Sequence, residues 1–345
     1  MVGTSNKVLK PTRQEDDKFA KKSGVLLEKL DNKILEINQL KAAATKETPE
    51  PESTTKDEFN SDGEEMEPSE AIDWDDKISV LQNVDPNAFR QYELACDRVK
   101  LFYIEQHEKQ TVAYNIQARI NFKTKTRAKM SVWEGLEKLN KLLDDSDPDT
   151  ELSQIDHALQ TAEAIRRDKK PRWFQLVGLI HDLGKLLYFF DSQGQWDVVG
   201  DTFPVGCKFL KKIIFAETFK KNSDFFNPLY NTKYGIYYKN CGLDKVMLSW
   251  GHDEYMYHVA KRNSKLPPEA LAMIRYHSFY PWHKENAYQY LMNEDDKKML
   301  SAVRAFNKYD LYSKSDDQPL LDVKELKGYY LDLIDEYFPT KIIEF

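Results

Sequence analysis

Residues 173–190, WFQLVGLIHDLGKLLYFF, decide the fold. This stretch is apolar on nearly every side, which is typical of a helix that is buried all round. Its only His, Asp, Glu, Lys or Arg side chains are His181, Asp182 and Lys185. On a helix these positions fall within one turn, so the three side chains can face a common site. Because an unpaired buried carboxylate is costly, we expect this group to be paired within the core or bound to a metal.

The remaining histidines bear on the choice between these two interpretations. A hydrogen-bonded core cluster would be sufficient for one His-Asp-Lys group taken alone. However, four further imidazole or carboxylate groups lie on or beside the apolar part of separate helical segments: His157, His252, His277 and Asp310. Imidazole and carboxylate without thiolate suit iron, zinc or manganese. The wider pattern therefore favours a metal site.

Helical spacing of apolar residues extends outward from this stretch in both directions. In contrast, residues 191–206 contain Gly194, Gly200, Pro204 and Gly206, and we expect a loop there. Alternating β-branched residues are nearly absent, so a sheet is not expected. The sequence thus predicts an all-α helical bundle with helices at 88–120, 127–143, 153–168, 244–262, 267–277 and 295–312.

The first 75 residues differ from the rest in charge and composition. They hold 11 Lys and Arg against 18 Asp and Glu, whereas residues 76–345 hold 39 of each sign. We expect residues 1–75 to form a disordered acidic extension and residues 76–345 a single catalytic domain. A short amphipathic helix is expected at 25–40, either transient or docked on a protein partner or a second copy. Ser61, followed by acidic residues, fits an acidophilic phosphorylation site.

Composition also excludes several classes of partner and location. The electrically neutral body argues against nucleic acid, which requires clustered Lys and Arg. No apolar run approaches the roughly 18 residues of a membrane span, so no membrane association is expected. The N-terminus lacks the apolar core of a secretory signal. Three cysteines, Cys96, Cys207 and Cys241, indicate a reducing, cytoplasmic setting.

The chain order His…His-Asp…Asp resembles the HD-domain superfamily, an all-helical, metal-dependent fold. The two additional histidines imply a second metal. Few protein ligands per ion would leave coordination positions open for substrate and oxygen. One metal could be bound by His157, His181 and Asp310. The other could be bound by His252 and His277, with Asp182 bridging the two metals.

A closer resemblance covers the chain from about residue 78 onward. Seven strings, in matching order and spacing, are similar to the myo-inositol oxygenase family. They are LLDDSDPD (142–149), HALQTAEAIRRD (157–168), LVGLIHDLGK (176–185), GQWDVVGDTFPVGC (194–207), LSWGHDEYMYHV (248–259), IRYHSFYPWH (274–283) and FNKYDLYSK (306–314). The resemblance implies that the same six ligands hold two iron ions, Fe(II) and Fe(III), with Asp182 bridging. It also implies cleavage of the myo-inositol ring by O2 to give D-glucuronate.

The resemblance further implies a set of substrate contacts. Lys185 would accept a proton from a substrate hydroxyl, the alternative being a simple counter-charge to Asp182. Arg90 would close the pocket as a lid, the alternative being a surface salt bridge. A ring with many hydroxyls needs many directed donors and acceptors. The implied contacts are Arg90, Asp144, Lys185, Gly200, Asp201, Ser278 and Lys314.

Two other functions stay open from the sequence. An HD-type phosphohydrolase would use the same metals and could bind phosphate through Arg90, Lys185 and Lys314. Against it, Asp144 and Asp201 would repel a phosphate but suit neutral hydroxyls. A metal-dependent inositol sensor without turnover is the second alternative.

Overall fold

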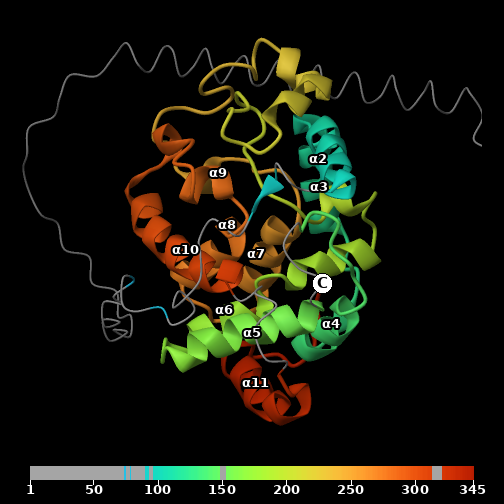
Figure 1. The fold of residues 1–345 in the computed structure, drawn as a ribbon, viewed down its shortest axis with the longest axis vertical. Coiled ribbons are helices and arrows are strands. Elements are labelled where there is room, and N and C mark those ends of the chain that lie inside the picture. Colours follow the sequence, from blue (N-terminus) through green and yellow to red (C-terminus); the bar gives the residue numbers. More distant parts are fainter. Residues whose placement is uncertain (1–73, 75–77, 79–89, 93–95, 148–152, 313–320) are drawn as a thin grey trace, which may run out of the picture. The chain divides into compact units, whose positions relative to one another are not determined.

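The computed structural model describes residues 74, 78, 90–92, 96–147, 153–312 and 321–345, with only the backbone at position 312 (Figure 1). These residues lie in the unit Ala71–Phe345. The expected helix at 25–40, the phosphorylation site at Ser61 and the substrate contact at Lys314 lie outside the described residues. The domain boundary at residue 75 stays a prediction.

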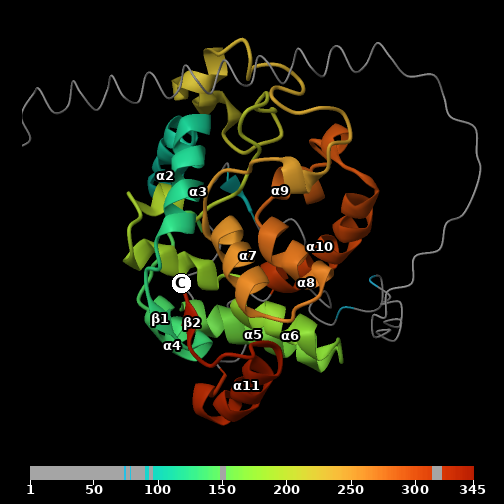
Figure 2. The same cartoon turned by 180° about the vertical axis from the view of Figure 1, so that it is seen from behind.

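Helices dominate the described part of the chain, which confirms the all-α prediction (Figures 1 and 2). The α-helices are α2 Asp97–Lys109, α3 Val112–Thr124, α4 Val132–Leu139, α5 Gln154–Arg167, α6 Arg172–Ile180, α7 His252–Asn263, α8 Pro268–Tyr276, α9 Tyr280–His283, α10 Glu294–Tyr312 and α11 Val323–Tyr337. The 3₁₀ turns are η4 Leu183–Phe189, η5 Gln195–Asp197, η6 Ala216–Lys221, η7 Ser223–Phe226, η8 Leu243–Lys245 and η9 Gln289–Leu291.

One short β-pairing was not predicted. Strand β1, Lys129–Met130, pairs antiparallel with β2, Ile343–Glu344 (Figure 2). The backbone of Phe345 extends this pairing through a 2.9 Å bond from its N–H to the Ala128 carbonyl. The Phe345 ring is buried in the core. Strands of two residues leave no periodic signal in a sequence, which is why pattern analysis misses them.

The central stretch at 173–190 is not one continuous α-helix. Helix α6 ends at Ile180, His181 and Asp182 form the turn that follows, and the chain continues as the tighter η4. Gly184 explains the close packing of η4 against α7, since a side chain there would collide with the His252 carbonyl. The predicted common site for His181, Asp182 and Lys185 therefore arises from a turn between two helical segments.

Three other predicted helix regions have wrong boundaries. The region 127–143 contains only α4, because residues 129–130 form β1. The region 88–120 is broken between α2 and α3, where the Thr111 hydroxyl caps α3 by accepting the Tyr114 N–H at 3.1 Å. The helix expected from residue 244 begins only at His252. Before it come η8 and then an extended stretch, in which the Ser249 N–H is bonded to the Phe203 carbonyl at 2.7 Å. This pairing with the 198–205 loop fixes the position of the first residue of α7.

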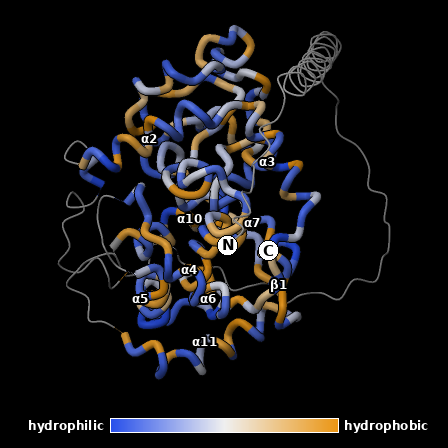
Figure 3. Tube along the Cα trace, turned by 90° about the vertical axis from the view of Figure 1, so that its right-hand side faces the viewer, coloured by the Kyte–Doolittle hydropathy of each residue, from blue (hydrophilic) through white to orange (hydrophobic). Residues whose placement is uncertain are grey.

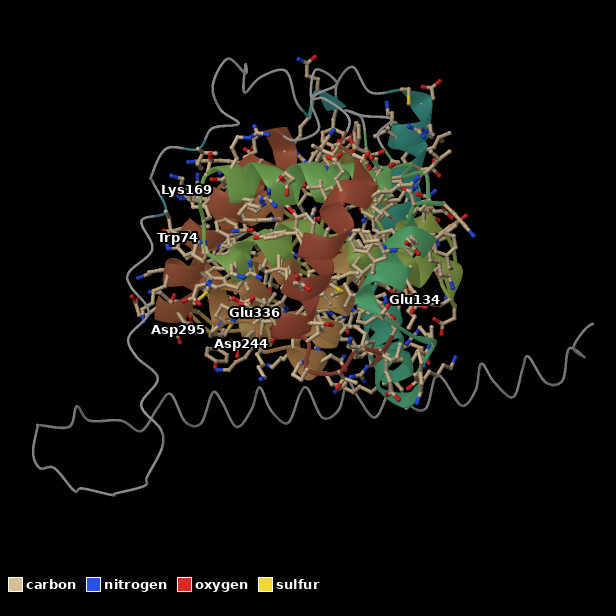
Figure 4. All side chains as sticks on the ribbon, turned by 90° about the horizontal axis from the view of Figure 1, so that it is seen from below. Trp74, Glu134, Lys169, Asp244, Asp295 and Glu336 are labelled. Atoms are coloured by element: carbon tan, nitrogen blue, oxygen red, sulfur yellow. The ribbon has the colours of Figure 1, made fainter. Side chains whose placement is uncertain are left out.

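The larger of two core clusters lies among α5, α6, α8 and α10. Large buried rings, such as Phe174, Phe306 and Tyr309, fill the space between these helices. In Figure 3 the outer helix α11 alternates between hydrophobic and hydrophilic residues, as expected of a helix with one buried face. Charged side chains such as Glu134 and Glu336 lie on the outer surface (Figure 4). Within the described ranges, none of the helices has the length and hydrophobicity of a membrane span.

Candidate metal centre

Six buried side chains from five helical segments converge at the ends of their helices. His157 lies in the first turn of α5, and His181 and Asp182 directly follow α6. The others are similarly placed: His252 is the first residue of α7, His277 directly follows α8, and Asp310 lies two residues before the end of α10. The structure thus brings together all six predicted metal ligands.

The first ligand group consists of His157, His181 and Asp310. The two histidine Nε2 atoms are 3.3 Å apart, and they lie 3.1 and 3.3 Å from Asp310 Oδ1. Asp182 Oδ2 completes this group at 3.7 Å from His157 Nε2 and 3.5 Å from His181 Nε2. Four ligand atoms therefore surround one small space.

The second ligand group consists of His252 and His277, together with the other oxygen of Asp182. The two Nε2 atoms are 3.3 Å apart, and each lies 3.4 Å from Asp182 Oδ1. Asp182 consequently directs one carboxylate oxygen to each group. This is the arrangement expected of a carboxylate that bridges two metal ions.

The ligand distances fit metal coordination. With metal–ligand bonds of about 2.1 Å, neighbouring ligand atoms are separated by about 3.0 Å in an octahedral site and about 3.4 Å in a tetrahedral one. Most of the distances in both groups lie close to this range. The donor set of imidazoles and carboxylates suits iron, manganese or zinc. The residues therefore fit a pair of such ions.

Backbone carbonyls hold three of the four histidine rings. Nδ1 of His181 lies 2.9 Å from the Gly178 carbonyl, and Nδ1 of His277 lies 3.0 Å from the Ile274 carbonyl. Both carbonyls belong to a final helical turn and lack a partner within the helix. His252 Nδ1 is similarly 2.7 Å from a loop carbonyl. Each bond leaves Nε2 directed at the metal space, which fixes ring orientation before any metal binds.

Lys185 lies beside the ligand groups, between two carboxylates. Its Nζ is 2.8 Å from Asp144 and 2.9 Å from Asp182, and it donates to Gln154 Oε1 at 3.4 Å. Burial alone would raise the pKa of Asp144, but Lys185 and the hydrogen bonds from Ser146 together outweigh this effect and lower the pKa below its usual value. Burial likewise opposes ionisation of Asp182, whose pKa Lys185 and the histidines nevertheless hold well below the usual range. Both groups are therefore carboxylates at neutral pH.

Arg90 and Asp201 form another part of the site. The Arg90 guanidinium donates to Asp201 at 2.6 Å and lies 3.3 Å from the centre of the Tyr280 ring. Burial raises the pKa of Asp201, and the nearby Arg90 only partly offsets this effect. Gly200 precedes Asp201 with a positive φ of 89°, and a side chain there would collide with Phe102.

Asp253 is a site residue that the sequence reasoning missed. It accepts the Ser278 N–H on Oδ2 and the Ser278 hydroxyl on Oδ1, both at 3.1 Å. Its Oδ1 also lies 2.7 Å from His252 Nε2, so it belongs to the surroundings of the second ligand group. A signal was present, because His252-Asp253 repeats the His-Asp dipeptide at 181–182.

A pocket opens onto both ligand groups. Its empty space is about 470 Å³, a volume that includes the open mouth. Apart from Lys314, which lies outside the described residues, all the predicted substrate contacts line it. Tyr92, Tyr103, Ser146, Asp147 and Tyr280 also line it and were not predicted. The predicted residues found in the lining are Arg90, Asp144, Lys185, Gly200, Asp201 and Ser278.

Known proteins resemble this chain over most of its length. The sequence profile of the family described as "Myo-inositol oxygenase" matches residues 96–345. A "Probable inositol oxygenase" of Oryza sativa subsp. japonica is 51% identical over 263 residues, 74% of this chain and 85% of the relative. An "Inositol oxygenase" of Dictyostelium discoideum is 52% identical over 261 residues, which cover 74% of this chain and 89% of the relative. An "Inositol oxygenase" of Homo sapiens is 48% identical over 276 residues, which cover 77% of this chain and 96% of the relative. The chain belongs to the myo-inositol oxygenase family.

Proposed function

We propose that this chain is a di-iron oxygenase that cleaves the ring of myo-inositol with O2 to give D-glucuronate. The observation that carries the proposal is the position of Asp182, with one oxygen facing each ligand group. Family membership supports inositol as the substrate. The reaction balances without an external reductant, because one inositol and one O2 give one glucuronic acid and one water. The substrate supplies all four electrons that O2 accepts.

The six ligands would hold two iron ions. His157, His181 and Asp310 would hold the first, His252 and His277 the second, and Asp182 would bridge them. When bound, the metal pair supplies Lewis acidity that lowers the pKa of a coordinated hydroxyl, and the redox capacity that O2 chemistry requires. The small number of protein ligands in the second group leaves room for substrate oxygens.

Lys185 is the proposed proton acceptor. Its Nζ lies where the ligand groups meet the pocket and forms part of the pocket lining. The positive charge of two bound metal ions would favour the neutral amine of Lys185, which could then take the proton that a substrate hydroxyl releases. Asp144 and Asp182 then stabilise the resulting ammonium ion, so the proton remains in a hydrogen-bonded group beside the substrate.

The remaining pocket groups would orient the polyol. Asp144 and Asp201 offer acceptors, and Ser278 offers a hydroxyl that acts as donor or acceptor. Lys314 would add a donor. Two carboxylates at the pocket wall favour neutral hydroxyls over a phosphate, which argues against a phosphohydrolase.

Arg90 would close the pocket. Its side chain is only 10% exposed, and its pairing with Asp201 and contact with Tyr280 hold it across the pocket wall. In that position it would exclude water and so protect reactive oxygen species from side reactions.

The test is a reconstitution under anaerobic conditions. The full chain is loaded with iron, mixed with myo-inositol, and then exposed to air while oxygen uptake and uronic acid are measured. We expect one uronate for each O2 consumed. Phosphate release from nucleotides without oxygen uptake would instead identify a hydrolase. Binding of inositol with neither product would identify a sensor.

A further inference from the structure

The two histidines of the second ligand group belong to neighbouring helices. His252 begins α7, His277 follows α8, and the two helices lie side by side (Figures 1 and 2). Glu254 lies two residues into α7 and Arg275 two residues before His277. Each member of this pair is therefore coupled to one metal-ligating histidine by a short piece of rigid helix.

Glu254 and Arg275 form a buried, bidentate ion pair. Arg275 Nε donates to Glu254 Oε2 at 2.8 Å, and its Nη2 donates to Oε1 at 3.0 Å. The two residues are only 3% and 7% exposed. Two parallel hydrogen bonds between planar groups fix direction as well as distance. Buried ion pairs often add little to stability compared with well-packed apolar residues. The role of this pair would therefore be to fix the relative position of α7 and α8.

The ion pair and the histidines connect the two helices on different faces. Two residues along an α-helix correspond to a rotation of about 200°. Glu254 therefore projects away from the face that carries His252, and Arg275 away from the face that carries His277. With one connection alone, the two helices could tilt relative to each other about that contact. Connections on both faces restrain the separation of the two Nε2 atoms.

Arg119 of α3 extends the network to the segment that enters α7. Its Nη2 lies 3.5 Å from Glu254 Oε1 and donates to the Leu248 carbonyl at 2.8 Å. His258 Nε2 adds a further contact to Glu254 at 3.3 Å. Glu254 is thus held by side chains from α3, α7 and α8.

We propose that Glu254 and Arg275 are positioning residues for the second metal. Their ion pair sets the separation of His252 and His277, and thereby the metal affinity of that ligand group, without acting on the first group. The inference rests on the proposed two-metal centre. Neither side chain contacts the ligand atoms themselves, so the effect passes through the helices.

The experiment is a metal titration of the metal-free full chain with Mn(II), in which free Mn(II) is followed by electron paramagnetic resonance. We expect two sites in the unaltered protein. In Glu254→Gln, which keeps the size but loses the charge, one site should weaken at least tenfold and the other should not change. In Arg275→Lys, which keeps the charge but loses the bidentate geometry, the same site should weaken to a smaller extent.

Two control variants separate positioning from stability. Glu336→Gln makes the same substitution in an exposed pair with Arg172, 2.7 Å apart, which joins α11 to α6. Leu333→Ala truncates a buried side chain of α11 and should lower the melting temperature. Both variants should bind two Mn(II) ions with unchanged affinity.

Three results would overturn the inference, and they differ from one another. Unaltered affinity at both sites in Glu254→Gln and Arg275→Lys would show that the pair does not position the histidines. Equal weakening of one site in Leu333→Ala would show a general effect of stability. Fewer than two sites in the unaltered protein would overturn the two-metal centre itself. If Glu254→Gln does not fold, Arg275→Lys carries the same test.

Discussion

The two halves of the pocket are built differently. The metal half, defined by the six ligands, stands on helix ends, and backbone carbonyls hold three of its four imidazoles. The polyol half, defined by Arg90, Asp144, Gly200 and Asp201, lies outside the α-helices. Its groups are held by ion pairs between side chains, and both Arg90 and Gly200 have positive φ values. Backbone-held ligands resist change, whereas paired side chains can exchange partners when a polyol enters.

The largest expected effect comes from Asp182→Ala, which removes the only residue shared by both ligand groups. The second group would keep two ligands, too few for tight binding. We expect metal content and activity to fall together, with activity at background, measured by metal analysis and oxygen uptake. Asp295→Ala, at a residue on the outer surface (Figure 4), is the control and should keep both. Two metals in Asp182→Ala would contradict a bridging role.

Lys185→Ala should separate chemistry from metal binding. The variant keeps all six ligands, so we expect two metals per chain. Turnover should fall by about 10²-fold or more, the usual contribution of a positioned proton acceptor. Metal analysis and single-turnover formation of uronate measure the two effects. Full turnover in this variant would reduce Lys185 to a counter-charge of Asp182.

Arg90→Gln tests the polyol half alone. Loss of a charged hydrogen bond costs about 1.5–3 kcal/mol, so KM should rise at least about tenfold while metal content stays the same. Because Arg90 opposes the rise in pKa that burial imposes on Asp201, its removal should raise that pKa further. The acidic limb of the kcat/KM profile should then move to higher pH. Arg98→Gln, at an exposed pair with Asp145, is the matched control. An unchanged KM would place Arg90 outside substrate binding.

The smallest expected effect concerns the pH dependence of stability and comes from His107, in the core behind the polyol half of the pocket. His107 is buried against Phe203 and stacks on Phe219, and burial lowers its pKa to about 3. The unfolded chain binds a proton there near pH 6.5, so stability should fall as the pH drops from about 6.5 toward 3. In His107→Phe, melting temperatures between pH 7 and 5 should depend less on pH. An identical pH dependence would show that His107 does not titrate as its burial implies.

How much the sequence could predict differs between the same two halves. The convergence of the six His and Asp side chains could be predicted because His181 and Asp182 interrupt an apolar stretch, and such an interruption is visible in the sequence alone. The end of α6 was not predictable, because the apolar run continues past His181, and Gly184 is no stronger a signal than Gly178, which lies inside α6. The contact of Arg90 with Asp201 joins residues 111 positions apart. No local sequence pattern indicates a partner at that separation. The same holds for Glu254 and Arg275, which are 21 positions apart.

The position of two metal ions relative to Asp182 tests the account most directly. A crystal of the iron-loaded chain, measured by anomalous scattering at the iron edge, should show two peaks, one beside each carboxylate oxygen of Asp182. The first peak should be within bonding distance of His157, His181 and Asp310, and the second of His252 and His277. A single peak, or two peaks that do not share Asp182, would contradict the account.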